Sequence, residues 1–436
     1  MTDPVRHGAL SLLLRYEEGA GYANLLADSD RLAALDPRDR ALTVALFYGA
    51  VERALTLDHY IGVLAGRSAA SLTPHTRAAL RLGLYQLLYM KIPAHAAVHA
   101  TVSLGKDPGE RALLNGVLRA AAKGDGRLVP PPATRDLARH LSVAYSIPAP
   151  TVRYFLSRLG EEESRALFAA FNTRPPLFLR TNTKKLTRAA LLTLLSEAGY
   201  EASEDPLTAH GLRLGGAVPV TALPGYREGY FFVQDAASQL AGDVLAPRPG
   251  DRILDLCACP GGKSFSAAML ADDRARILSR DIHESKLSLI TEGAERLGLA
   301  SVTAEVWDAT VPDPSQSGEV DRIICDVPCS GLGVIAKKPD LRYRGLSSVD
   351  ELCALSSRIL DAAAVALRPG GTMVFSTCTL TAEENEQAVT AFLSRHSDFY
   401  TEEFTVGGLT SEEGMLTLWP HRHGTDGFFM AKLRRK

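Results

Sequence analysis

The chain has 436 residues, which is room for about three domains of ordinary size. Its 46% hydrophobic and 22% charged residues are typical of a globular protein, and a net charge of −2 excludes a generally basic surface. No apolar run reaches membrane-spanning length and Met1–Pro4 does not resemble a signal peptide, so we expect a cytoplasmic protein without a membrane partner.

The first part of the chain is helical in period. Val5–Glu17 places leucines on one face, and Asp36-Pro37 opens a helix that runs through Val51. Two further helices, Arg77–Met90 and His95–Ser103, are separated by Pro93. The pattern predicts a helical bundle from residue 5 to about 123.

This bundle contains a basic run without acidic residues. Between His59 and Lys106 there is no Asp or Glu, and five residues are basic: Arg67, Arg77, Arg81, Lys91 and Lys106. A solvated helix face would explain such a run, but the complete absence of acid favours a polyanion such as RNA.

The Gly- and Pro-rich stretch Lys123–Thr134 is the best domain boundary. Helices are expected over 135–145, 149–158 and 161–171, followed by a strand over 177–182, a helix over 188–198 and a strand over 212–214. We therefore expect a small α/β domain here. This domain contains a basic run without acidic residues, in which hydroxyl and amide side chains are interleaved, and such a run suits an RNA backbone. An exposed loop is the alternative. The candidate RNA contacts are Arg180, Lys184 and Lys185.

Strands and helices alternate from Asp251 onward, after a strand and helix over 229–245. Alternation of this kind predicts a doubly wound, mainly parallel α/β sheet with a Rossmann-like fold. The expected domains are a helical one over 1–128, a small α/β one over 129–228 and a catalytic one over 229–436.

A glycine loop follows the first strand of this sheet, in Asp251–Ser264, DRILDLCACPGGKS. Gly261 and Gly262 allow close approach of a ligand, and the following helix directs free amides at it. The spacing matches neither common phosphate-binding pattern, so a cofactor with a sugar and a carboxylate is favoured over ATP or NAD. Asp281 and Asp308, at the ends of the next two strands, are expected at its ribose and adenine.

All six cysteines lie beyond residue 256, which implies reduced thiols: Cys257, Cys259, Cys325, Cys329, Cys353 and Cys378. Cys257-Ala258-Cys259 lacks the spacing of a zinc site, so no metal is expected. Two cysteines follow strands at the edge where open α/β sheets carry their sites: Cys329 in DVPCSGLG and Cys378 in STCTLTAEENE. Capping of the next helix accounts for Glu384, Asn385 and Glu386.

These motifs resemble those of a known family. DLCACPGGK, DVPCS and STCT, in this order, resemble motifs I, IV and VI of the Sun-type RNA cytosine-C5 methyltransferases, and GLYQLLYMKIPAHAAVHATVSLGK resembles the NusB-type domain that precedes the catalytic part in the RsmB branch. The resemblance implies S-adenosylmethionine as cofactor, a cytosine of 16S ribosomal RNA as substrate and a monomer. The residues implied to line the cofactor are Cys257, Ala258, Cys259, Pro260, Gly261, Gly262, Lys263, Asp281, Asp308 and Asp326.

The resemblance also implies roles in the reaction. Cytosine C5 is a poor nucleophile until a thiolate adds to C6. Cys378 is implied as that nucleophile, Cys329 as the helper in product release or as general base, and Asp326 as the residue that holds the flipped base, best in its protonated form. Lys338 and Arg342, in the basic Pro-Asp segment, are expected at substrate phosphate.

Two other functions stay open. Methylation of cytosine in DNA would make Cys329 essential and Cys378 dispensable, and another RNA is also possible as substrate. A non-catalytic RNA-binding assembly factor would keep the fold without the chemistry. The presence of both cysteines favours the RNA enzyme.

Overall fold

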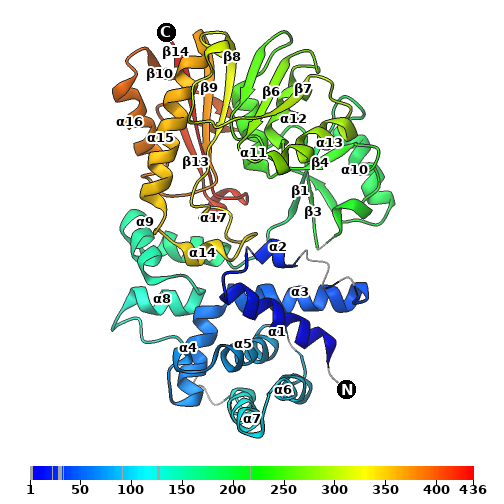
Figure 1. Cartoon of the computed structure of the whole chain (residues 1–436), viewed down its shortest axis with the longest axis vertical. Helices are drawn as coiled ribbons and strands as arrows, with labels where there is room; N and C mark the ends of the chain where they lie inside the picture. The colour runs from blue at the N-terminus through cyan, green and yellow to red at the C-terminus, as the bar shows by residue number, and fades with distance from the viewer. Residues whose placement is uncertain are drawn as a thin grey trace. The chain divides into compact units, whose positions relative to one another are not determined.

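The computed structural model describes residues 3–21, 23–27, 32, 34–90, 92–124, 128–216 and 218–436. The chain divides into two compact units (Figure 1). The helical unit consists of residues 1–173 and 335–346, and the catalytic unit consists of residues 174–334 and 347–436.

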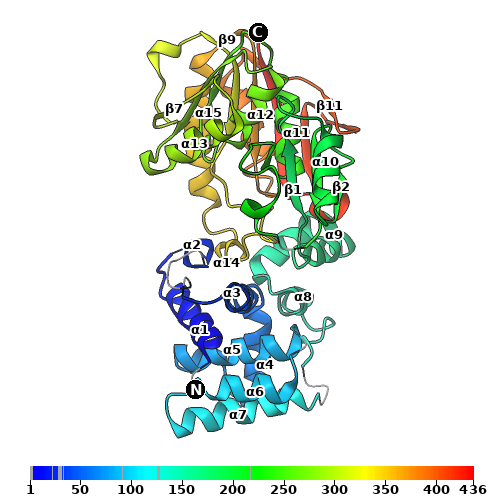
Figure 2. The same cartoon turned by 90° about the vertical axis from the view of Figure 1, so that its right-hand side faces the viewer.

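The helical unit is built from amphipathic helices (Figure 2). The apolar faces of those between residues 4 and 122 meet in one core. Aspartates begin several of them: Asp3, Asp36 and Asp107 each accept hydrogen bonds from the first turn of the helix that follows. The helices are α1 (Pro4–Glu17), α2 (Ala23–Ala27), α3 (Pro37–Glu52), α4 (Ala54–Ala65), α5 (Pro74–Leu88), α6 (Ala94–Val102), α7 (Pro108–Ala122), α8 (Leu137–Tyr145), α9 (Ala149–Ala170) and α14 (Leu341–Arg344).

The predicted break between the helices over 149–158 and 161–171 is present as a kink in α9. Gly160 has φ 77°, in the left-handed region that favours glycine, and it separates two helical halves. α8 and α9 group with the bundle in the helical unit. The expected domain bounds, 1–128, 129–228 and 229–436, stay a prediction.

The small α/β domain has a four-stranded antiparallel sheet in the order β2-β3-β1-β4. Leucines from β1, β3 and α10 form its core. The elements are β1 (Leu177–Thr181), α10 (Arg188–Glu197), β2 (Ala202–Glu204), β3 (Gly211–Leu214) and β4 (Phe231–Val233). The strand expected within 229–245 therefore belongs to this sheet, not to the catalytic one.

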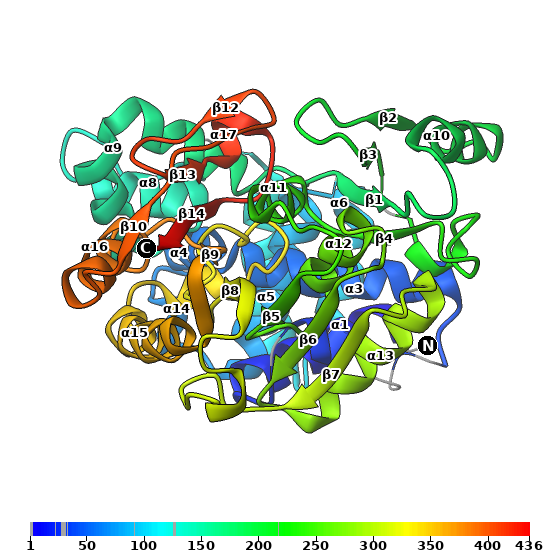
Figure 3. The ribbon, with the colours of Figure 1, turned by 90° about the horizontal axis from the view of Figure 1, so that it is seen from above.

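The catalytic sheet has eight strands, in the order β10-β14-β9-β8-β5-β6-β7, with β13 paired to β14. β7, β6, β5, β8 and β9 are parallel, as predicted, and lie side by side in Figure 3. The strands are β5 (Arg252–Asp255), β6 (Arg276–Asp281), β7 (Val302–Val306), β8 (Val320–Asp326), β9 (Leu367–Thr377), β10 (Phe399–Thr401), β13 (Met415–Leu418) and β14 (Phe428–Arg435). A separate hairpin joins β11 (Thr405–Val406) to β12 (Leu409–Thr410).

Helices cover both faces of this sheet because successive strand residues point to opposite sides. Ile253 packs with α11, α12 and α13, whereas the next residue, Leu254, packs with α15 and α16. The helices are α11 (Ala236–Leu245), α12 (Gly262–Leu270), α13 (Leu287–Leu297), α15 (Val349–Ala366), α16 (Glu386–Arg395) and α17 (Pro420–His423). Within the described ranges, no helix combines the length and apolarity that crossing a bilayer requires.

Candidate active site

The glycine loop turns the chain sharply between β5 and α12. Gly261 has φ 105° and stands at the N-cap of α12, where no side chain caps the first amides. Those amides are therefore available to a ligand at the carboxyl end of β5. Gln234 braces the same turn, since its amide donates to the Gly262 carbonyl and accepts from Ser266.

Cys257 lies among the carboxylates expected around the cofactor. Burial raises the pKa of its thiol, and the negative charges of four aspartates raise it further: Asp255, Asp326, Asp281 and Asp308. This thiol is therefore neutral at physiological pH. The loop, the two expected nucleoside-binding aspartates and the aspartate of the fourth motif thus come together at one edge of the sheet, as predicted.

The side chains at the ends of β6 and β7 fit a nucleoside. Asp281 ends β6, and only its Oδ1 is engaged by the amide of His283 in the hydrogen bonds described. The next side chain, Ile282, is 58% exposed and offers an apolar surface that a planar base can cover. Hydrogen bonds from the amide and hydroxyl of Thr310 lower the pKa of Asp308, so it is an ionised acceptor. Ile282 is not among the site residues predicted from the sequence.

Lys263 and Asp326 form an ion pair beside the fourth motif. The Lys263 Nζ lies 2.5 Å from Asp326 Oδ2, and the Ser376 hydroxyl donates to Asp326 Oδ1 at 2.7 Å. Burial alone would lower the pKa of Lys263, but the adjacent Asp326 carboxylate outweighs burial and raises it. Both oxygens of Asp326 therefore have donors in this structure, and the protonated form expected from the sequence stays a prediction.

The two cysteines meet at the ends of β8 and β9. Cys329 Sγ lies 3.2 Å from Cys378 Sγ, and the amide of Cys378 donates to Cys329 Sγ at 3.3 Å. Both are free thiols and partly exposed. The hydrogen bond to Cys378 raises the pKa of Cys329 well above its usual value, and burial adds to the effect. Cys329 therefore keeps its proton, and either sulfur can be the donor in the contact between them.

Comparison with known proteins decides the family. The profile of the 16S rRNA methyltransferase RsmB/F family matches residues 243–434, that of the NusB family matches 4–123, and that of the RsmF/B-like ferredoxin-like domain matches 151–221. A probable ribosomal RNA small subunit methyltransferase B from Synechocystis is 37% identical over 92% of each chain. The Klebsiella pneumoniae ribosomal RNA small subunit methyltransferase B is 36% identical over 96% of this chain and 95% of its own.

The chain belongs to the RsmB/F methyltransferase family. It is an S-adenosylmethionine-dependent RNA methyltransferase with an N-terminal NusB domain and a ferredoxin-like domain. The crystal structure of PH0851 is similar over 100% of this chain and 99% of its own, with 25% identity and a TM-score of 0.83.

Two of the basic residues expected to contact RNA are internal in this RsmB/F protein, so that prediction is wrong for them. Arg180 is 1% exposed, and its guanidinium donates to the Gln239 carbonyl and to Asp243. Arg342 is fully buried in the helical unit. Their positions in the sequence do not show which way these side chains point, because some residues of every strand and helix face the interior: alternate ones in a strand, and those three or four apart in a helix.

The other predicted RNA contacts stay predictions. Lys184 Nζ is paired with Asp273 at 2.6 Å, and Lys185 Nζ donates to the carbonyls of Glu228 and Arg296. Both lysines join the ferredoxin-like domain to the catalytic sheet. Lys338 is exposed.

The basic run of the bundle is not acid-free in space. Arg77 and Arg81 both pair with Glu17, and Arg81 also pairs with Asp58. These carboxylates come from parts of the sequence outside the run, so its charge is partly neutralised. Lys91, a member of the run, lies outside the described residues.

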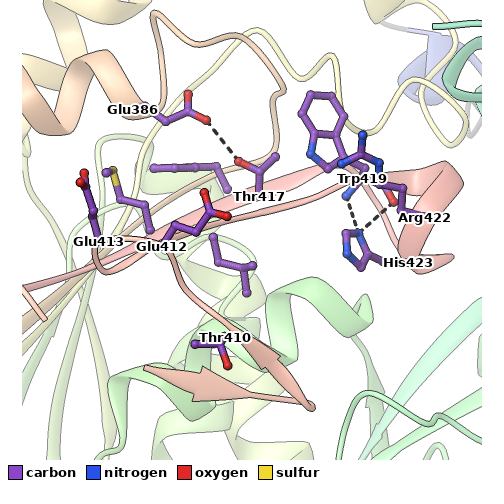
Figure 4. A pocket seen from close by; sticks show the side chains of 11 residues that line it. Glu386, Thr410, Glu412, Glu413, Thr417, Trp419, Arg422 and His423 are labelled. Atoms are coloured by element: carbon purple, nitrogen blue, oxygen red, sulfur yellow. Dashed lines mark hydrogen bonds between the residues drawn. The ribbon is translucent and has the colours of Figure 1, made fainter. Parts of the chain in front are cut away.

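A cavity of about 650 Å³ lies away from the cysteines, between β13, α17 and the loop before β13 (Figure 4). Glu412 and Glu413 line it on one side, and Trp419, Arg422 and His423 line it on the other. None of the predicted site residues borders this cavity. It is therefore distinct from the site that the sequence predicts.

Proposed function

We propose that the chain transfers a methyl group to C5 of a cytosine in small-subunit ribosomal RNA through a covalent bond between Cys378 and C6. The observation that carries the proposal is the 3.2 Å approach of Cys329 Sγ to Cys378 Sγ beside Asp326, at the edge of the sheet that bears the cofactor loop. S-adenosylmethionine, when bound, supplies an electrophilic methyl group. Residues Cys257 to Lys263, Asp281 and Asp308 would hold it.

Attack on C6 falls to Cys378. The thiolate is the reactive form of cysteine, so Cys378 gives its proton to solvent as its sulfur adds to C6, whereas Cys329 keeps its own proton at this stage. The Lys263 ammonium lies close enough to interact with Cys378 electrostatically. The Cys378–C6 bond makes C5 electron-rich, so that C5 can take the methyl group.

Release falls to Cys329. The largest cause of its raised pKa is the hydrogen bond to Cys378, and that contact changes once the Cys378 sulfur is bonded to carbon. The Cys329 thiol can then give its proton to solvent, and the resulting thiolate takes the proton from C5. The electron pair of the C5–H bond restores the C5–C6 double bond as the Cys378–C6 bond breaks and Cys378 leaves as a thiolate. One thiol acts as nucleophile while the other acts as base.

Asp326 would hold the base. Lys263 and Ser376 fix its carboxylate, which can accept a hydrogen bond from the exocyclic amine of cytosine. A substrate in small-subunit ribosomal RNA is supported by what the named relatives act on.

The test is a covalent trap. The protein is incubated with S-adenosylmethionine and small-subunit ribosomal RNA carrying 5-fluorocytidine, whose C5 has no proton to lose, and denaturing gels report the complex. We expect a complex with the unsubstituted protein and with Cys329→Ala, and none with Cys378→Ala.

Ordinary cytidine RNA separates the two thiols further. There we expect Cys329→Ala to accumulate the complex because release is blocked. A complex that requires Cys329 and tolerates Cys378→Ala would instead favour the DNA-type mechanism, and absence of any complex with RNA would favour a non-catalytic assembly factor.

A further inference from the structure

We propose that Glu384 is a positioning residue that holds the loop carrying Cys329 against the loop carrying Cys378. The inference rests on the proposed function, because it assigns the residue to the two-cysteine reaction. It replaces helix capping, which we expected for Glu384 and Asn385 from the sequence. Asn385 stands at the N-cap of α16 but makes no side-chain capping hydrogen bond.

The Glu384 carboxylate lies inside the protein and joins the two loops directly. Glu384 is only 3% exposed. Oε1 accepts from the amide of Ser330 at 2.7 Å, and Oε2 accepts from the Ser330 hydroxyl at 2.6 Å. Oε2 also accepts from the Thr381 hydroxyl at 2.6 Å. Ser330 follows Cys329 in the chain, and Thr381 lies three residues after Cys378.

The direction of these bonds is determined by the donors. Ser330 has one hydroxyl proton, which goes to Glu384, so the Thr379 hydroxyl must donate to Ser330 across their 2.7 Å contact. The carboxylate therefore fixes the direction of a second hydrogen bond between the loops, from Thr379 to Ser330. Removing it leaves a buried amide and two hydroxyls without their acceptor.

The two loops depend on Glu384 unequally. Two of its three hydrogen bonds go to Ser330, on the Cys329 side. The Cys378 side keeps a separate brace, because Asn385 accepts from the Thr377 hydroxyl and donates to the Thr379 carbonyl. Loss of Glu384 should therefore displace Cys329 more than Cys378, and so impair release more than attack.

The charge of Glu384 also acts on Cys329. The groups that raise the pKa of this thiol are Cys378, through the hydrogen bond and its charge, then Glu384 and Asp326, in addition to burial. Glu384→Gln keeps the shape and one acceptor oxygen for the Ser330 amide, while rotated hydroxyls can accept from its amide group. This substitution therefore separates the charge from the packing.

The experiment measures turnover and the covalent complex on ordinary cytidine RNA. We expect Glu384→Ala to lower kcat about 100-fold, the cost of a small misplacement of a reacting group, with little change in the KM for RNA. We also expect it to accumulate the complex, as Cys329→Ala does. Glu384→Gln should keep most of the activity and shift the pH profile of complex resolution to lower pH.

Controls separate the possible outcomes. Glu292→Ala, an exposed carboxylate on α13, should change neither rate nor complex. Unchanged affinity for S-adenosylmethionine shows that Glu384→Ala is folded; if it does not fold, Ser330→Ala and Thr381→Ala each remove one hydrogen bond to Glu384, Ser330→Ala together with the contact to Thr379, and each should accumulate the complex.

The two proposals fail differently. If the unsubstituted protein forms no complex with 5-fluorocytidine RNA, the proposed function fails. If it forms one but the folded Glu384→Ala protein, or both single-bond variants, resolve the cytidine complex at the unsubstituted rate, only the positioning role is overturned.

Discussion

Burial of the Asp255 carboxyl makes the stability of the folded protein depend on pH. It ends β5 and is 1% exposed; its Oδ2 accepts from Ser264 at 2.6 Å, while Oδ1 has no hydrogen-bond partner in the described part of the chain. Burial raises the pKa of this carboxyl to about 7. The folded state thus keeps a proton that the unfolded state loses near pH 4, so this group's contribution to stability falls as pH rises from about 4 to about 7.

Asp255→Asn should remove this dependence. Relative to the unsubstituted protein, the variant should gain up to about 1.4 kcal/mol of unfolding free energy for each pH unit between about 4.5 and 6.5, and no more above about 7. Urea unfolding at several pH values measures the difference. A difference that stays flat with pH would mean that the Asp255 carboxyl is not protonated in the folded state.

At the level of elements, the two cysteine loops are held by a close backbone contact. The Gly333 amide donates to the Cys378 carbonyl at 3.0 Å, and its carbonyl accepts from the Gly427 amide at 2.9 Å. A Cβ at position 333 would lie 1.9 Å from the Gly427 oxygen. Only glycine lets the fourth motif, the sixth motif and the turn before β14 meet in this way.

Gly333→Ala should therefore separate the loops. Because the obstructing atom is backbone, we expect kcat to fall by about 100-fold, since small displacements of reacting groups cost that much. Gly116→Ala on α7 is the matched control, because its Cβ would meet nothing within 4 Å; it should stabilise the helical unit by about 0.5–1 kcal/mol and leave the rate unchanged. Steady-state kinetics with a normal rate for Gly333→Ala would contradict the contact.

Across the whole molecule, one segment of the second half of the chain belongs to the helical unit. Residues 335–346 begin two residues after Gly333, and they include α14. Arg342 Nη1 donates to the Glu52 carbonyl and to Asn172 Oδ1, each at 3.0 Å, and the Tyr343 hydroxyl donates to the Val51 carbonyl at 2.7 Å. The chain thus passes from the Cys329 loop directly into an anchor within the NusB-containing unit.

Substitutions at two basic residues of this segment should have different effects, one on stability and the other on RNA binding. Arg342→Met leaves buried carbonyl oxygens without their hydrogen-bond donor and should lower the unfolding free energy by about 2–4 kcal/mol. Lys338→Glu, at an exposed position, should leave stability unchanged, raise the KM for RNA and reduce its salt dependence. Denaturant unfolding and RNA binding at two salt concentrations distinguish them; an Arg342→Met protein of normal stability with weakened RNA binding would restore the original assignment of Arg342 to RNA.

Short-range patterns predicted the parts of the site that one strand and one loop define. The turn at Gly261 and Gly262, the strand-ending aspartates Asp281 and Asp308 and the two strand-ending cysteines follow from local rules, because parallel strands bring their carboxyl ends to one edge. Glu384 was assigned to capping because its partners, Ser330 and Thr381, lie in loops whose approach no local pattern encodes.

The amino-acid sequence by itself determined the fold class, the cofactor loop and the two thiols, since each depends on residue order within a short stretch. Only the tertiary structure decided which basic side chains are exposed and unpaired, and so available to bind RNA. Arg81 meets Glu17 and Asp58, and Arg342 is buried among backbone carbonyls. Electrostatic energy depends on distance in space and on burial rather than on separation along the chain, so partners and solvent exposure appear only after the chain has folded.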